Sequence, residues 1–542
     1  MSKSNQTGYR PPSVIKVRGA EAPDGTPYVR ITASGRHQWL PRSAFTGSGS
    51  TALAALTSAN IPLIGDEWAQ CRNEVVALKS YPPKPLIDRV GWNGAHFALG
   101  DGTVFSPHEA EVPVVLFRRN HHKFAQRGAI TKWRRGTAIL IHQPIATFVL
   151  FTAFVGPLLR LGHSVVNQGF ELADPKGVGK STLQRLAAAV YGPADSPEGF
   201  NYWVPANVTV NGLEGTMAEH RDLSMVIEET NLFAAGETDK ARATKFNELV
   251  FKLANGTGKR RHEDPERRRD RYLFLTSTNE PLAQLLLGHR VVVSDAASDR
   301  LLTIAIEPDR PYGVFDSVLP GQTSGEMAQR LNACVRNNHG LAIRQYLQRL
   351  VIDCHERPKR VETELNAAIE TFRDKVGVDR NDGSALRVAD AFGMVYAAGL
   401  FAMRYEAVSL RLDPLRAAMT CYDLNRAAQA DSPNLYERLI ALAEHPHALR
   451  IPRKCLPQLI DADIDQAPAI VRTGQAGRVE LLLTESQLRR AFPVKRLLFE
   501  DERVLKIAVA ENGRKQTKRK IRKGHDDERF YCFRLNSGKA RN

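Results

Sequence analysis

The chain has 542 residues and a formal net charge of +16, with 75 lysine and arginine residues against 59 acidic ones. A chain of this length should hold about three or four domains, and its charge favours a polyanionic partner, nucleic acid first among them. Its six cysteines form no Cys-x-x-Cys pair, which excludes a zinc ribbon or a disulfide framework and predicts a cytoplasmic protein. The amino terminus lacks an apolar signal core.

Four regions follow one another along the chain. Residues 1–125 read as short strands broken by turns, as in 28–32 and 90–99, with a flexible loop at 47–50. Residues 126–310 alternate apolar strands with helical segments, which predicts an α/β fold with a mostly parallel sheet. Residues 311–430 show helical spacing, and residues 450–542 form a basic carboxy-terminal segment. The most apolar stretch, 144–159, is too short to span a bilayer, so we expect a buried helix and no membrane contact.

The most informative motif is an apolar strand, a glycine-bearing turn and a helix start within residues 169–182. Backbone N–H groups of such a turn surround a β-phosphate, the Lys180 ammonium reaches the β/γ oxygens, and the Ser181 hydroxyl ligates Mg²⁺. Asp174 stands where the G-x-x-x-x-G-K-[ST] pattern has its first glycine, and its charge has the wrong sign for a phosphate. The predicted phosphate-binding residues are Asp174, Pro175, Lys176, Gly177, Val178, Gly179, Lys180, Ser181 and Thr182.

A second apolar run, residues 223–227, leads into Glu228 and Glu229. Paired acids at a strand end fit hydrolysis, with Glu228 holding Mg²⁺ and Glu229 polarising the attacking water. Aspartate is commoner at the first position. The alternative is that both acids only favour the start of a following helix.

Two further residues complete the predicted catalytic set. Asn279 follows the strand-like run 272–276, and its amide could orient the attacking water beside the γ-phosphate. Its alternative role is to cap a turn before Pro281. Arg300 precedes the run 301–306 and could place a guanidinium at a neighbouring subunit's γ-phosphate, or form an ordinary surface salt bridge.

Two basic segments are candidates for nucleic-acid contacts. The first lies between the acid pair and Asn279, and there the alternative is a solvated loop, because nearby acids dilute its charge. The second lies between strand-like runs 504–510 and 530–535, after a short helix at 485–492, an order that looks like a winged helix with a basic tip. The predicted contact residues are Lys259, Arg260, Arg261, Arg267, Arg268, Arg269, Arg514, Lys515, Lys518, Arg519 and Lys520.

Taken together, these residues resemble the helicase-like "domain of unknown function 927" (DUF927) family of phage, plasmid and mobile-element proteins, itself similar to superfamily 3 and AAA+ helicases. The resemblance covers about residues 85–430 and rests on short stretches in family order. Besides the phosphate loop and the acid pair, these are residues 90–92, 128–133, 156–159, 211–215, 253–259, 338–340 and 387–389.

The resemblance implies an ATP- and Mg²⁺-dependent homo-oligomeric ring, a hexamer, that translocates on nucleic acid, DNA rather than RNA, during replication of a mobile element. Arg300 would act in the neighbouring subunit's site, and loop 259–271 would move with the bound strand. Two alternatives stay open. One is a nucleic-acid-stimulated ATPase switch in a defence or regulatory system, and the other is a DNA-binding initiator with a structural nucleotide.

Overall fold

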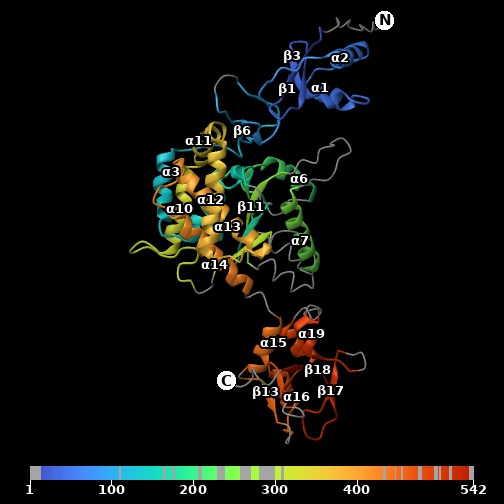
Figure 1. The fold of residues 1–542 in the computed structure, drawn as a ribbon, viewed down its shortest axis with the longest axis vertical. Coiled ribbons are helices and arrows are strands. Elements are labelled where there is room, and N and C mark those ends of the chain that lie inside the picture. The colour runs from blue at the N-terminus through green and yellow to red at the C-terminus, as the bar shows by residue number, and fades with distance from the viewer. Residues whose placement is uncertain are drawn as a thin grey trace, which may run out of the picture.

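The computed structural model in Figure 1 describes residues 14–108, 112–162, 167–173, 177–205, 210–228, 239–256, 270–279, 300–306, 310–430, 435–445, 447–452, 456–473, 479–492, 498–499, 502–511 and 515–535. From the amino to the carboxyl end these residues build a small sheet with helices, a parallel sheet flanked by helices, a set of long helices and a second small sheet. The predicted mixed α/β class is confirmed.

The first sheet is antiparallel and consists of β1 (Lys16–Glu21), β2 (Pro27–Ala33) and β3 (Arg36–Pro41) in that order. The turn η1 (Arg42–Phe45) leads to α1 (Ser50–Ser58) and α2 (Asp66–Ala77), which pack on one face of the sheet. The strand-like pattern predicts neither helix. They form because Ala52 and Leu56, one helical turn apart, are buried together with Cys71 and Val75.

Short strands link this sheet to the centre of the molecule. A parallel pair, β4 (Leu86–Ile87) and β8 (Val114–Val115), lies beside an antiparallel set of β5 (Gly91–Asn93), β6 (His96–Ala98) and β7 (Val104–Phe105). Gly94 and Ala95 form the β5–β6 turn, between the paired residues Asn93 and His96. The predicted strand at 90–99 is therefore a hairpin.

The central sheet is four-stranded, and its neighbouring strands are parallel. Its strands are β9 (Gly169–Ala173), β10 (Leu223–Val226), β11 (Tyr272–Thr278) and β12 (Leu301–Ala305), in the order β10-β11-β9-β12. Strand β11, the third of these four along the chain, thus lies between β9 and β10. Its helices are α3 (Ile130–Thr137), α4 (Pro144–Thr152), α5 (Lys180–Ala189), α6 (Val210–Glu219) and α7 (Asp239–Asn255), with short turns η2 (Ala138–Leu140) and η3 (Gly156–Leu158).

The long helices share one hydrophobic core with this sheet. They are α10 (Ser324–Asn337), α11 (Ala342–Glu356), α12 (Pro358–Val376), α13 (Gly383–Arg404) and α14 (Pro414–Ala430). Phe170 of β9 packs edge-on against Phe392 of α13, and every residue of α4 is buried, as predicted for that apolar stretch. Helix α13 is long and apolar enough to cross a membrane, but 72% of its most apolar window is buried, which is the pattern of a core helix.

The carboxy-terminal sheet has the order β13-β14-β15-β18-β16, with β17 also paired to β18. The predicted strand 504–510 is wrong for most of its length, because α19 occupies Glu502–Ile507 and buries Val504 completely. The predicted basic tip contains strand β17. The elements are α15 (Leu435–Glu444), β13 (Leu449–Ile451), α16 (Asp461–Gln466), β14 (Ile470–Thr473), β15 (Val479–Leu483), α17 (Glu485–Ala491), α19, β16 (Ala508–Val509), β17 (Thr517–Arg519) and β18 (Glu528–Leu535).

Candidate functional site

The turn after β9 leads directly into α5, as the sequence predicts for a phosphate loop. Gly177 has φ +90° and Gly179 has φ +105°, a region that side chains with a Cβ rarely adopt. Gly179 precedes Lys180, the first residue of α5, so the amino end of that helix faces the turn. Ser181 is exposed and Thr182 is buried in the first helical turn, while Asp174, Pro175 and Lys176 lie outside the described residues. This arrangement offers backbone N–H groups to an anion.

The structure brings two predicted residues from neighbouring strands into contact. Thr278 of β11 pairs with Ala173 of β9, so Asn279 and the phosphate loop leave the sheet side by side. The Nζ atom of Lys180, a residue only 7% exposed, donates to Oδ1 of Asn279 at 3.1 Å. The sequence placed these residues about a hundred positions apart, and their contact locates one polar centre at the carboxyl edge of the sheet.

Glu228 reaches the same edge from the strand beyond β11. The Ile227 amide donates to Leu275 O at 2.8 Å, and Thr276 Oγ1 donates to the backbone oxygen of Glu228 at 3.3 Å. Glu228 is half-buried, and its proposed partner Glu229 lies outside the described residues.

Gln184 joins these three chain segments, and sequence reasoning missed it. Its Nε2 donates to Ile227 O at 2.7 Å, and its Oε1 accepts from Ser277 Oγ at 3.0 Å. The side chain is 1% exposed. Its position between Leu183 and the buried run Leu186–Ala189 is the signal that could have found it, because buried polar groups almost always have hydrogen-bond partners.

A second missed feature is the turn at 310–316, which braces the phosphate loop. The Val314 amide donates to Val178 O at 2.9 Å. Gly313 has φ +60°, and a Cβ there would lie 2.4 Å from the same oxygen. Arg310 closes the turn by donating to Gly313 O at 2.8 Å and pairing with Asp316. The shape of the phosphate loop therefore depends on a turn over 130 residues later in the chain.

Arg300 lies at the opposite edge of the sheet. Its backbone oxygen accepts from the Gly169 amide at 2.7 Å, at the amino end of β9, and its guanidinium lies over the Phe251 ring of α7 at 5.4 Å. Because Lys180 follows the carboxyl end of that strand, Arg300 is separated from its own phosphate loop by the length of the sheet. Its predicted role in a neighbouring subunit's site therefore stays a prediction.

The first basic segment, with Lys259, Arg260, Arg261, Arg267, Arg268 and Arg269, lies outside the described residues, but both ends of it are placed. The Asp270 amide donates to Gly256 O at 2.9 Å. Asn167 contacts the chain before and after this segment, since its Nδ2 donates to Leu253 O at 3.2 Å and to Asp270 O at 2.8 Å. Gly256 and Asp270, the residues that flank 257–269, are therefore hydrogen-bonded neighbours, and we call this part of the fold the neck.

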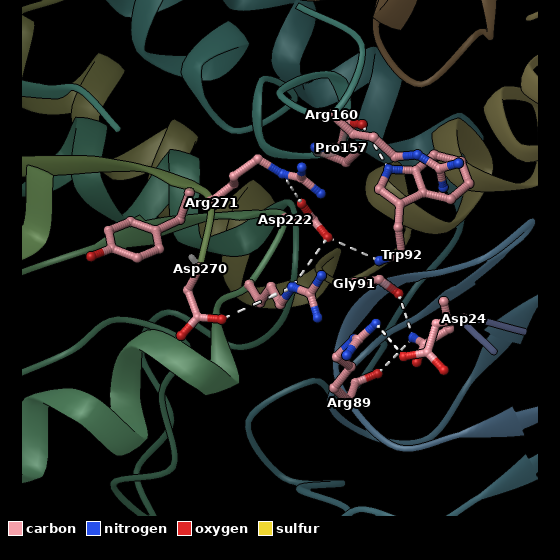
Figure 2. A network of polar contacts seen from close by, with 12 residues as sticks. Asp24, Arg89, Gly91, Trp92, Pro157, Arg160, Asp222, Asp270 and Arg271 are labelled. Carbon is pink, nitrogen blue, oxygen red and sulfur yellow. Dashed lines mark hydrogen bonds and ion pairs between the residues drawn. The ribbon is translucent and has the colours of Figure 1, made fainter. Parts of the chain in front are cut away.

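A buried carboxylate anchors this neck (Figure 2). Asp222, which is fully buried, accepts from Arg271 Nε at 3.1 Å with one oxygen and from the Trp92 amide at 3.0 Å with the other. Arg221 lies 3.8 Å from Asp222 and 3.9 Å from Asp270. Burial raises the pKa of Asp270, which the charge of Arg221 opposes. The neck is thereby tied to the β5–β6 hairpin, whose Trp92 donates to Pro157 O at 2.9 Å.

The second basic segment is only partly available for binding. Arg519 donates to both carboxylate oxygens of Glu480 at 3.1 Å, and this pairing raises its pKa. Lys515 lies over the Phe499 ring at 4.5 Å. Lys518 and Lys520 are exposed, while Arg514 lies outside the described residues. The structure thus separates two exposed lysines from an arginine that already has a partner.

Comparison with known proteins agrees with this picture. The family model described as "Domain of unknown function (DUF927)" matches residues 28–269. The resemblance to this family that the sequence predicts is confirmed over these residues. Its match includes the phosphate loop, Glu228 and the first basic segment, and it ends just before the neck residue Asp270. No curated protein is significantly similar to the chain.

A solved structure described as "SCCmec type IV Cch - active helicase" has a TM-score of 0.56 and 14% identity, covering 97% of this chain and 93% of that one. The two proteins therefore share a fold over nearly their whole lengths. Two structures of the "NrS-1 C terminal region" match with TM-scores of 0.25 and 0.23, at 12% and 11% identity, over 71% and 70% of this chain and 87% and 83% of theirs.

Proposed function

We propose that this protein is an ATP-driven nucleic-acid translocase, a helicase that works as an oligomeric ring, hexameric as the family resemblance implies. The observation that carries the proposal is the contact of Lys180 with Asn279 beside a turn of positive-φ glycines. The fold shared with a protein described as an active helicase supports it, as does the net charge of +16.

The residues at the carboxyl edge fit a nucleotide and Mg²⁺. A Cβ at Gly177 would meet no described residue within 4 Å, so this part of the turn has room for a ligand. Ser181 and Glu228 supply hydroxyl and carboxylate oxygens, the ligand type that Mg²⁺ prefers. When bound, the metal would neutralise charge on the β- and γ-phosphate oxygens.

Each side chain then has a distinct task. Lys180 holds the β/γ oxygens, and Asn279 exchanges its contact with Lys180 for one with the attacking water. Glu229 accepts the proton of that water, which makes it the general base. Gln184 keeps α5, β10 and β11 in register, so that these groups converge. Arg300 of one subunit would stabilise transition-state charge in the next.

The decisive experiment measures ATP hydrolysis with and without single-stranded DNA, together with the mass of the assembly. We expect hydrolysis that rises with DNA, and a ring-sized mass. Strand displacement with ATP separates a helicase from an ATPase switch. Absence of steady-state hydrolysis would favour an initiator with a structural nucleotide.

Mixing subunits tests Arg300. The Arg300→Ala variant should bind ATP without hydrolysing it, since the guanidinium acts on the transition state. Adding Lys180→Ala subunits, whose Arg300 is intact, should restore some hydrolysis in mixed rings. No recovery in rings shown to be mixed would leave Arg300 as a structural residue stacked on Phe251.

A further inference from the structure

The β1–β2–β3 sheet buries one face under α1 and α2, whereas its other face is buried at Ala20 and Tyr28 and open beyond them. Val29, Ile31 and Leu40 point towards α1 and α2 and are at most 7% exposed. Side chains alternate along a strand, and paired residues share a face. The strand register therefore places a second set of residues together on the opposite face: Lys16 beside Thr32 and His37, and Arg18 beside Arg30 and Trp39.

This open face carries positive charge that the fold does not neutralise. Arg18 and Arg30 lie directly opposite each other in β1 and β2, a position in which like charges destabilise a sheet. Neither guanidinium has an acidic partner within the described part of the chain, and the Nε of Arg30 is buried there without a hydrogen bond. None of the open-face positions of the three strands is acidic. Two facing arginines lower the stability of the sheet, so stability does not explain why they are there. A bound polyanion would explain them, because its charge would neutralise both.

The ring of Trp39 favours a ligand with unpaired bases, which can stack on it. It pairs with Arg30 across β2 and β3 and is half-buried, packed at the border of a small apolar cluster that includes Tyr28 and Leu86. Aromatic rings beside cationic side chains on a sheet are the surface on which single-stranded nucleic acid stacks its bases. In a duplex those base faces are covered.

The sheet is joined to the neck of the basic loop. Asp24, in the turn before β2, pairs with Arg89 at 3.0 Å, and Arg89 is followed by the hairpin that Asp222 binds. Figure 2 shows Asp24, Arg89, Trp92, Asp222 and Arg271 in one continuous group. The sheet is therefore linked through Asp24 and Arg89 to the hairpin that contacts Asp222 beside the neck.

We propose that the open face of this sheet, with Lys16, Arg18, Arg30 and Trp39, is a binding platform for single-stranded nucleic acid. Phosphates contact the cationic side chains and a base stacks on Trp39. The platform lies outside the nucleotide site, and it requires neither ATP nor a ring.

Binding of a labelled oligothymidine of about 30 nucleotides to the full chain, followed by anisotropy over a salt series, tests the platform. For single strands the slope of log K against log salt is about −0.7 per phosphate contact. The Arg18→Ala/Arg30→Ala variant should therefore flatten the slope by about 1.4. The matched control is Arg72→Ala/Lys79→Ala, which removes two charges of the same domain outside the open face, and it should keep the slope. Equal slopes for the wild type and both variants would overturn the proposal.

Trp39→Ala separates stacking from charge. It should weaken binding about tenfold, the lower range for one stacked base, and leave the salt slope unchanged. A 5-iodouracil oligonucleotide should crosslink to the peptide that contains β3. Crosslinks confined to other peptides, or an equal loss of blunt-duplex binding, would contradict a single-strand platform.

Arg18→Glu distinguishes function from structure. The new carboxylate opposite Arg30 should raise the thermal unfolding midpoint of the full chain and at the same time weaken oligothymidine binding more than Arg18→Ala does. If stability rises but binding is unchanged, the face has only a structural role. If the oligonucleotide protects neither Arg18 nor Arg30 from arginine-specific modification in the wild type, the proposal also fails.

Discussion

The two edges of the central sheet are built from different interactions. At the carboxyl edge, Lys180 donates to Asn279, while Gln184 donates to Ile227 O and accepts from Ser277. At the amino edge, the fully buried carboxylate of Asp222 pairs with Arg271, which is 33% exposed, and also accepts from the Trp92 amide. A hydrogen bond contributes about 0.5–1.5 kcal/mol, while leaving a buried polar group without its partner costs about 1–3 kcal/mol, and more for a charged group.

The difference assigns a role to each edge. Contacts at the carboxyl edge can exchange when a ligand binds, because each costs little to replace. The amino edge keeps its geometry, since its charges cannot separate cheaply, and it holds the neck of loop 257–269 against the β5–β6 hairpin (Figure 2). A nucleotide-driven machine needs both, one part that responds and one against which it moves.

The largest effect, on nucleotide affinity, should come from a substitution at the carboxyl edge of the central sheet. Lys180→Ala removes the cation at the phosphate loop, so nucleotide affinity should collapse and kcat/KM for ATP should fall by about 10³-fold or more. The control is Lys132→Ala, which removes an exposed lysine of α3. ATP binding as tight as that of the wild type would show that this edge is no phosphate site.

A substitution at the amino edge should instead change the free energy of unfolding. Asp222→Ala leaves the buried Trp92 amide and the partly exposed Arg271 without their acceptor, and we expect the free energy of unfolding to drop by about 1–3 kcal/mol. Asp195→Ala removes an exposed pair with Arg336 and should cost less than about 1 kcal/mol. Urea unfolding measures both. Similar midpoints for the two variants would remove the contrast between the edges.

Much of the central sheet could be predicted from the sequence because its signals are local. The glycine turn before Lys180 and the apolar runs of β9, β10 and β11 mark strands and a helix start. The order in which these strands pair is not local, since β11 enters between β9 and β10. The Lys180–Asn279 contact therefore needed the structure.

Other features depended on tertiary partners. A run of cationic residues does not reveal that Arg519 binds Glu480 while Lys518 stays exposed. Residues 504–507 look like a strand in isolation, but Val504 is buried in a helix under the carboxy-terminal sheet. In each case packing overrode the local pattern.

Gly313→Ala tests whether the turn at 310–316 affects nucleotide binding at the carboxyl edge of the sheet. The new Cβ would lie 2.4 Å from Val178 O, and relieving such a clash costs about 1–3 kcal/mol. We expect nucleotide affinity to fall about tenfold with little change in the unfolding midpoint. Gly321→Ala is the matched control, with φ +77° and nothing within 4 Å. If both variants bind nucleotide equally well, the turn does not shape the phosphate loop.

The smallest expected effect is a pH dependence at the amino edge. His220, two residues before Asp222, is fully buried and its Nδ1 contacts Thr216 O at 2.7 Å. Burial, and then the charge of Lys123, hold its pKa well below 6.5. The folded chain therefore keeps His220 neutral while the unfolded chain takes up a proton below about pH 6.5. Its contribution is present above that pH and is lost as the pH falls, by up to about 1.4 kcal/mol per pH unit. His220→Gln can still donate to Thr216 O but does not titrate, and the titrations of the carboxylates cancel in the difference between variant and wild type. That difference in unfolding free energy should shift in favour of the variant from pH 6.5 to pH 5.5. A difference that stays constant over this range would mean that His220 is protonated in the folded protein and that the amino edge tolerates a further buried charge.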